Sequence, residues 1–261
     1  MPELPDLEVF KHNIFKQLVS KTLESITVCN PTKVNTHESQ LTQALANREL
    51  TAIHRYGKEL LFDFGDGEII ASHLMLSGKI AIANTLQAVE AIPYKICILH
   101  FKDQSLVFSD MGGLCTIKYK PLRDRVPDAF GQDFTLDYFL NIAQKKPRAN
   151  IKAFIIDQKV VKGIGNAYAD EILWAAYISP HSTVGNIPEN MMVQLYEAIN
   201  TVLAQAVESI KALQPDIISG EERRFLQVHT KLKKQTATGF PIIIERIASK
   251  TTYYTQEQVL Y

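Results

Sequence analysis

The spacing of hydrophobic residues changes near residue 132 of this 261-residue chain. Before that point, apolar residues recur at helical spacing behind Pro5, which predicts an amphipathic helix ending near Lys21. A short helix is expected over 40–47. The remaining apolar runs are short and separated by turn residues, which predicts strands over 22–29, 50–56, 60–64, 69–74, 96–101, 105–109 and 115–119. This arrangement is typical of an antiparallel sandwich or barrel.

After a linker expected over 121–132, the pattern becomes helical. Helices are predicted over 136–143, 149–158 and 167–177, and a long helix should begin at Pro188 and end before Pro215. The tail returns to strand, with a hairpin expected from 242–247 and 251–255 around Ala248, Ser249 and Lys250.

Charge and cysteine content narrow the function classes. The 28 basic and 28 acidic residues cancel, which counts mildly against a dedicated nucleic-acid binder. However, binding needs a basic face rather than a basic average. Basic residues cluster at 145–152 and 231–234, where each cluster could equally be a solvated surface. Three scattered cysteines indicate a reducing compartment and exclude a cysteine-rich zinc site. No apolar run approaches a membrane span, so a cytoplasmic protein is expected.

The first residues suggest covalent chemistry. Removal of Met1 would leave Pro2 with a secondary amine, and α-amino groups titrate near ~8. Such an amine can condense with an aldehyde carbon and then accept electrons. Glu3 beside it could transfer protons. The alternative is structural, because Pro5 also suits the first turn of a helix.

A glycine-rich turn, Lys162-Gly163-Ile164-Gly165-Asn166, joins two predicted helices. Glycines allow close approach of a ligand, and Asn166 could cap the next helix, whose N-terminus attracts anions. This predicts a phosphate clamp, although an ordinary helix connection would have the same composition.

These motifs resemble the formamidopyrimidine-DNA glycosylase and endonuclease VIII family. The matching segments are Pro2-Glu3-Leu4-Pro5, Arg55-Tyr56-Gly57-Lys58, His73-Leu74-Met75-Leu76-Ser77-Gly78 and Gly163 to Glu171, in the family's order and spacing. The resemblance implies an α+β, multidomain base-excision repair enzyme that binds damaged, abasic or structured DNA. It implies an N-terminal β-sandwich with an N-terminal helix over 1–132, a helix–two-turn–helix domain over 133–224 and a finger hairpin over 225–261. It also implies a monomer without an organic cofactor.

The resemblance also assigns roles to residues. Pro2 would attack the sugar C1′ of a damaged nucleotide, Glu3 would act as acid or base, and Lys58 would hold phosphate and aid elimination. The predicted DNA-binding residues are His73, Arg148, Lys152, Gly165, Asn166 and Lys250. For Lys58 and His73 the alternatives are a solvated lysine at a strand end and a core histidine.

Departures from the family pattern modify these expectations. The finger segments that usually hold four zinc-binding cysteines read Thr236-Ala237-Thr238 and Thr255-Gln256-Glu257-Gln258, so a zincless finger without metal is predicted. Lys250 stands where the family has an arginine, which weakens the phosphate contact. The predicted intercalating residues are Leu76, Met111 and Leu114. Leu76 stands where the family has a methionine, and the loop that carries Met111 and Leu114 has Gly112 and Gly113 in place of two arginines.

The altered loop shapes the expected specificity. Segment 215–224 is also shorter than the loop that covers an oxidised purine in the family. We therefore expect a glycosylase with abasic-site lyase activity that favours abasic or poorly stacked lesions. The alternative is a non-catalytic or weakly catalytic homologue that binds DNA structures.

Overall fold

The computed structural model describes all of residues 1–261, which fold as two compact units. One unit contains residues 1–2, 6–124 and 214–221, and the other contains residues 3–5, 125–213 and 222–261. The predicted α+β class, with an N-terminal sandwich and a later helical region, is confirmed. The tail after residue 225 is part of the helical unit and does not form a separate one. None of the helices is both long and apolar enough to cross a bilayer.

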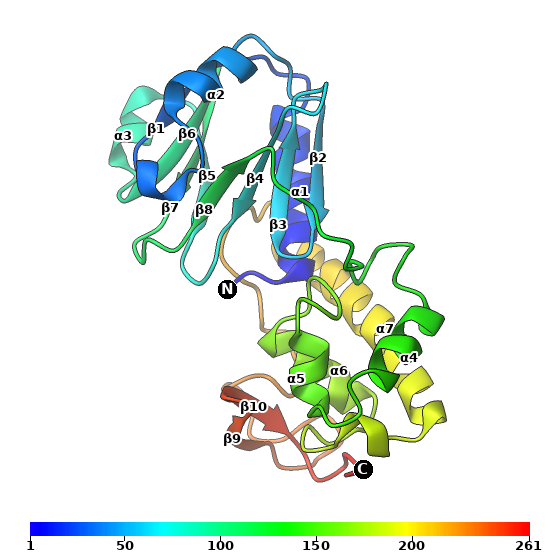
Figure 1. Ribbon diagram of the computed structural model, residues 1–261. Coiled ribbons are helices and arrows are strands. Elements are labelled where there is room, and N and C mark those ends of the chain that lie inside the picture. Colours follow the sequence, from blue (N-terminus) through cyan, green and yellow to red (C-terminus); the bar gives the residue numbers. More distant parts are fainter. The chain divides into compact units, whose positions relative to one another are not determined.

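The first unit is built on two four-stranded antiparallel sheets, ordered β1-β6-β7-β5 and β2-β3-β4-β8 (Figure 1). Phe62 and Phe108 meet edge to face in the core, with ring centroids 5.7 Å apart. The strands are β1 (Leu23–Val28), β2 (Ala52–Tyr56), β3 (Glu59–Asp63), β4 (Ile69–His73), β5 (Lys79–Ala83), β6 (Lys95–Phe101), β7 (Gln104–Ser109) and β8 (Thr116–Tyr119).

Helix α1 (Leu4–Leu18) supplies the predicted apolar stripe of this core. Leu7, Phe10, Ile14 and Leu18 are all buried there. Burying each such side chain contributes about 1.5–3 kcal/mol, so the stripe holds the start of the chain firmly. The unit also contains a 3-10 turn at Pro31–Lys33, α2 (Glu38–Leu45) and α3 (Leu86–Ala91).

Two elements of this unit were not predicted. Strand β5 completes one sheet by pairing with β7, from Lys79↔Ser109 to Ala83↔Ser105. Helix α3 has only six residues and begins where Thr85 accepts a hydrogen bond from the backbone nitrogen of Ala88. Both elements are short, and β5 is stabilised by pairing with a strand that is distant in the sequence. The local sequence pattern therefore did not predict either of them.

Residues 214–221 return to the first unit after the long helix of the second. Asn13 Nδ2 donates to the carbonyl oxygens of Pro215 and Ile217, at 2.8 and 2.9 Å. The backbone nitrogen of Ile80 donates to Ser219 Oγ at 3.1 Å. Side-chain and backbone bonds therefore fix a segment that has no regular structure.

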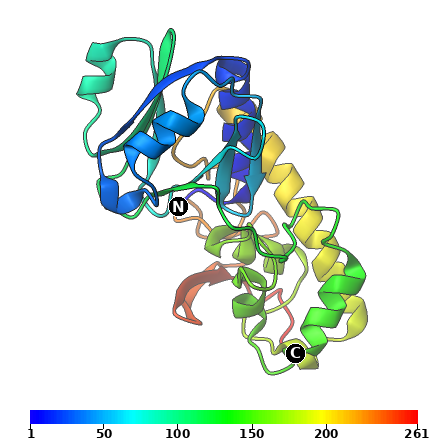
Figure 2. The ribbon, with the colours of Figure 1, turned by 45° about the horizontal axis from the view of Figure 1, so that its top comes forward.

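The second unit contains the four α-helices α4 to α7 and one hairpin, whose course can be followed in Figures 1 and 2. Its elements are α4 (Leu136–Gln144), α5 (Ile151–Ile156), α6 (Asn166–Ala175), a 3-10 turn at Val184–Asn186, α7 (Glu189–Leu213), β9 (Ile243–Ile247) and β10 (Lys250–Tyr254). Thr135 and Asn150 cap α4 and α5 by accepting backbone hydrogen bonds. Helix α5 is shorter than predicted because the backbone is already extended at Asp157.

The hairpin β9–β10 lies beside α6 in both ribbon views. Ala248 and Ser249 form its turn with φ values of +48° and +64°. Two consecutive left-handed residues match the twist of a two-residue hairpin. Lys250, expected within the turn, is instead the first residue of β10 and pairs with Ile247.

Candidate functional site

The first two residues belong to the sandwich unit. The amino group of Met1 forms an ion pair with Glu221, and Pro2 is buried. With Met1 present, the nitrogen of Pro2 is a peptide nitrogen and not an amine. The predicted nucleophile therefore depends on removal of Met1.

Glu3 belongs to the helical unit, where its carboxylate meets the N-terminus of α6. Its Oε1 accepts a hydrogen bond from the backbone nitrogen of Ala167 at 3.0 Å, and its Oε2 lies 3.5 Å from that of Tyr168. The first amides of a helix have no partner within the helix and favour negative charge. The prediction that Asn166 caps this helix is wrong: Gly165 occupies the cap position, and Glu3 supplies the oxygen atoms.

The glycines of the turn before α6 make room for the start of the chain. A Cβ on Gly165 would lie 2.3 Å from Glu3 Cδ, and one on Gly163 would lie 2.6 Å from a methyl carbon of Leu4. The backbone nitrogen of Leu4 also donates to the carbonyl oxygen of Gly163. The structure thus brings together two motifs that are about 160 residues apart in the sequence.

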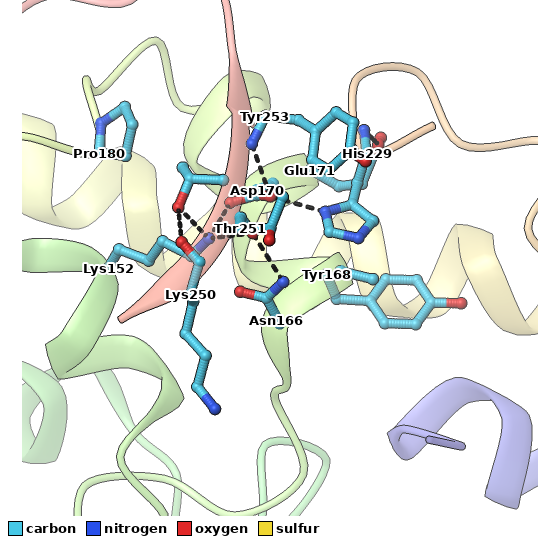
Figure 3. Close-up of polar contacts among 12 residues, drawn as sticks. Lys152, Asn166, Tyr168, Asp170, Glu171, Pro180, His229, Lys250, Thr251 and Tyr253 are labelled. Carbon is cyan, nitrogen blue, oxygen red and sulfur yellow. Dashed lines mark hydrogen bonds and ion pairs between the residues drawn. The ribbon is translucent and has the colours of Figure 1, made fainter. Parts of the chain in front are cut away.

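Asn166 and Lys250 lie at the junction between α6 and the hairpin (Figure 3). Asn166 Nδ2 donates to the carbonyl oxygen of Thr251 at 2.9 Å. The Lys250 side chain is exposed and points away from this junction. Arg148 is also exposed, in the segment between α4 and α5. Their contacts with DNA stay predictions.

Lys152 does not lie on the basic surface that the sequence predicted. Its side chain is fully buried on α5, and its Nζ lies 2.7 Å from Asp170 Oδ1. Burial lowers the pKa of Lys152, and the Asp170 carboxylate opposes that effect. The prediction of direct DNA binding fails because the ammonium is enclosed by protein.

Lys58 and His73 lie near each other in the sandwich unit. Lys58 follows Gly57 in the turn between β2 and β3, and His73 at the end of β4 pairs with Glu59. His73 Nδ1 accepts a hydrogen bond from the backbone nitrogen of Met75, so its proton resides on Nε2. Burial lowers the pKa of His73 below 6.5; Lys58 adds to the effect and Glu59 opposes it.

The three predicted intercalating residues are exposed in the same unit. Leu76, Met111 and Leu114 have 67%, 76% and 41% of their surface accessible. Single exposed apolar side chains are common on protein surfaces, so exposure alone does not make these three a contact surface. Their insertion into DNA is not established by exposure and stays a prediction.

One buried carboxylate organises both loops. Asp110 accepts hydrogen bonds from the backbone nitrogens of Gly112, Leu114 and Cys115, at 2.9, 2.6 and 2.7 Å. It also accepts one from Ser77 Oγ at 2.5 Å, which joins the 73–78 loop to the 110–115 loop. Burial raises the pKa of Asp110, but these hydrogen bonds together hold it below 3.8.

The finger has no cysteine; instead, its threonines surround Glu257. Glu257 Oε2 accepts hydrogen bonds from Thr255 Oγ1 and Thr236 Oγ1, at 3.0 and 3.4 Å, and from Trp174 Nε1 at 3.2 Å. Hydroxyl groups around one carboxylate do not match the thiolate set that structural zinc prefers. The residues present do not fit a zinc site.

Sequence reasoning missed the supporting residues Asp110, Asp170 and His229. Asp170 stands four residues after Asn166, so helical spacing alone would place both on the face of α6 that meets the hairpin. Asp110 had no such signal, because its partners lie in loops. His229 had none either, because it lies in a loop and its partners Asp170 and Tyr253 are distant in the sequence.

Comparison with known proteins agrees with this fold. The formamidopyrimidine-DNA glycosylase N-terminal domain matches residues 1–117, and the H2TH domain of the same enzyme matches residues 126–214. The formamidopyrimidine-DNA glycosylase of Carboxydothermus hydrogenoformans is 29% identical and covers 97% of this chain and 98% of its own. That of Cytobacillus firmus is 32% identical over 80% of this chain and 79% of its own.

Solved structures of Fpg and MutM have the same fold as this chain. The Lactococcus lactis Fpg in complex with abasic-site DNA has a TM-score of 0.86 and 27% identity, over 97% of this chain and 98% of that one. MutM in complex with carbocyclic 8-oxo-G DNA has a TM-score of 0.85 and 27% identity, over 98% of both chains. The chain belongs to the formamidopyrimidine-DNA glycosylase family, whose members are DNA glycosylases with abasic-site lyase activity.

Proposed function

We propose that this chain is a base-excision DNA glycosylase and abasic-site lyase that acts through the nitrogen of Pro2. The observation that supports this best is the position of Glu3. The residue next to Pro2 has its carboxylate held at the N-terminus of α6 by two backbone amides. A catalytic carboxylate needs such fixed geometry, because positioned proton transfer contributes about 10²–10⁴-fold to a rate.

The proposed chemistry has two stages. The lone pair of the Pro2 nitrogen forms a bond to C1′, the bond from C1′ to the damaged base breaks, and the base leaves with the proton that the nitrogen loses. Protonation of O4′ by Glu3 then breaks the bond from C1′ to O4′ and leaves an iminium ion between Pro2 and C1′. Loss of a proton from C2′ expels the 3′ phosphate by β-elimination, and water releases the sugar remnant from Pro2. Glu3 is the proposed proton carrier at the sugar.

Phosphate contacts are proposed for Lys58, His73 and Asn166, with Arg148 and Lys250 adding positive charge. Removing a nucleotide from the stack costs a few kcal/mol, which apolar residues at the gap can offset. Leu76, Met111 and Leu114 offer bulk but no side-chain hydrogen-bond donor for the opposite base. We therefore propose a preference for abasic sites and for lesions in bubbles or single strands, with the protein acting as a monomer.

Borohydride trapping tests the lyase. Reduction of the iminium in the presence of abasic DNA should join the native protein, shown by mass to lack Met1, covalently to the strand. A matched chain extended ahead of Met1, in which the Pro2 nitrogen stays in a peptide bond, should not be trapped at that nitrogen. Absence of the covalent complex with a correctly processed native chain would remove the proposal.

A second candidate is a homologue that binds DNA structures with little catalysis. The loop with Gly112 and Gly113 favours it, because that loop cannot replace the hydrogen bonds of an extruded nucleotide. Binding to branched or abasic DNA that is unchanged by Glu3→Gln and unaccompanied by strand cleavage would support it. Efficient release of an oxidised base from duplex DNA would exclude it.

A further inference from the structure

The hairpin that carries Lys250 is attached to the helices through a buried ion pair. Lys152 on α5 and Asp170 on α6 both have fully buried side chains, and their charged atoms are 2.7 Å apart (Figure 3). Two buried charges are costly to desolvate, and such a pair holds only where further hydrogen bonds satisfy both groups. The partners that satisfy them lie largely on β10.

The Asp170 side of the pair holds the middle of β10. Its Oδ2 accepts a hydrogen bond from the backbone nitrogen of Tyr253 at 3.0 Å and lies 2.6 Å from His229 Nδ1. The His229 ring packs on that of Tyr253, with centroids 4.5 Å apart. One carboxylate therefore fixes the strand and the loop that packs beside it.

The ammonium of Lys152 is linked through Thr252 to the backbone of Lys250, whose side chain is exposed. Lys152 Nζ donates to Thr252 Oγ1 at 2.7 Å, and Thr252 Oγ1 donates to the carbonyl oxygen of Lys250 at 3.0 Å. A second contact runs from Lys152 Nζ to the carbonyl oxygen of Thr251 at 3.3 Å. The Lys250 backbone is thus held through one hydroxyl by an ammonium ion inside the unit.

An isolated two-stranded hairpin is marginally stable in water, so its position must be set by what it packs against. We propose that Lys152 and Asp170 are positioning residues for Lys250, fixing the first residue of β10 so that the Lys250 ammonium meets a DNA phosphate. The proposal rests on the proposed function of Lys250 in DNA binding. It also assigns to the sequence-predicted Lys152 an indirect role in place of direct contact.

The test is a double-mutant cycle read from the salt dependence of binding. The probe is a duplex with a stable abasic-site analogue, titrated between roughly 50 and 200 mM salt. In the native chain, Lys250→Ala should lower the slope of log affinity against log salt by about 0.9, the value of one lost phosphate contact. In Asp170→Asn and in Thr252→Val the slope should already be lower, and adding Lys250→Ala should change it no further.

Thr252→Val keeps the test decisive if Asp170→Asn does not fold, because it removes one hydroxyl and preserves shape. Leu203→Ala is the control: it opens a cavity in the apolar core at α7 but removes none of the hydrogen bonds that hold β10, so Lys250→Ala should keep its full effect there. The proposal would be overturned if Lys250→Ala lowered the salt slope by its full amount in the Thr252→Val background, or if it did not lower the slope in the native chain. Binding does not require the iminium, so failed borohydride trapping with this cycle intact would remove the Pro2 chemistry alone.

Discussion

The Oε1 atom of Glu3 lies 3.0 Å from the backbone nitrogen of Ala167, which joins the start of the chain to the first turn of α6. Glu3 therefore has a structural reason for its position that is independent of DNA. Gly165 is the residue that permits this contact, because any side chain there would occupy the space of the carboxylate.

Gly165→Ala should reduce catalysis far more than binding. Its Cβ would lie 2.3 Å from Glu3 Cδ and would force the carboxylate away from the sugar. We expect a loss of roughly 100-fold in abasic-strand cleavage under single turnover, within the range for a misplaced acid–base group. Ala167→Gly alters the same turn but keeps the amide and the space, so its cleavage rate should stay near native. Equal loss in both variants would contradict this role of Gly165.

His73→Ala should weaken DNA binding without changing its salt dependence at pH 7.5. Burial keeps the pKa of His73 below 6.5, so the ring is neutral and donates through Nε2 without releasing a counterion. A drop in the salt slope at that pH would show that the ring binds DNA as a cation. Because the unfolded state takes up this proton first, His73 should also make the free energy of unfolding decrease as pH falls below 6.5.

Asp110→Asn should loosen the two loops that carry the exposed apolar residues. Four donors lose a charged acceptor, and we expect the free energy of unfolding to fall by about 1–3 kcal/mol at pH 7. The pKa of Asp110 lies below 3.8, so its stabilisation is complete above that pH and is lost as pH falls through the folded value. Urea denaturation at pH 7 and pH 3 should show the difference from native shrinking in acid. A pH-independent difference would contradict the account.

Acid, but not a chelator, should change the fluorescence of Trp174, which contacts Glu257 together with Thr236 and Thr255. Burial raises the pKa of Glu257, yet hydrogen bonds from Thr238, Trp174, Thr255 and Thr236 hold it below 4.5. Trp174, the single tryptophan, donates to this carboxylate and is a direct fluorescence probe. Its emission should be unchanged by EDTA, should shift in Glu257→Gln and should titrate below pH 4.5. A spectral change on chelation would indicate a bound metal.

Much of the fold was accessible from the sequence because the strong periodic segments are local signals. The stripe from Leu7 to Leu18 and the long α7 both follow from helical spacing alone. Strand β5 and the return of residues 214–221 could not be predicted, since each is defined by partners distant in the chain.

The site was predicted less completely. Motifs indicated Glu3, Gly165 and His73, whose roles stay predictions, but they did not indicate that Glu3 caps α6 in place of Asn166. Lys152 was misplaced because a lysine among basic neighbours normally lies on the surface. Lys152 is buried because it pairs with Asp170. Helical spacing relates Asp170 to Asn166 on the same helix, but it does not indicate that Asp170 meets α5, the helix before the glycine-rich turn.

The most direct measurement of the central claim is the mass and position of the sugar adduct after borohydride reduction with abasic DNA. Peptide mapping should find the adduct on the nitrogen of a peptide that begins at Pro2, with Met1 absent. An adduct on Lys58 or another lysine, or an N-terminal peptide that retains Met1 in a chain that still cleaves abasic DNA, would contradict it.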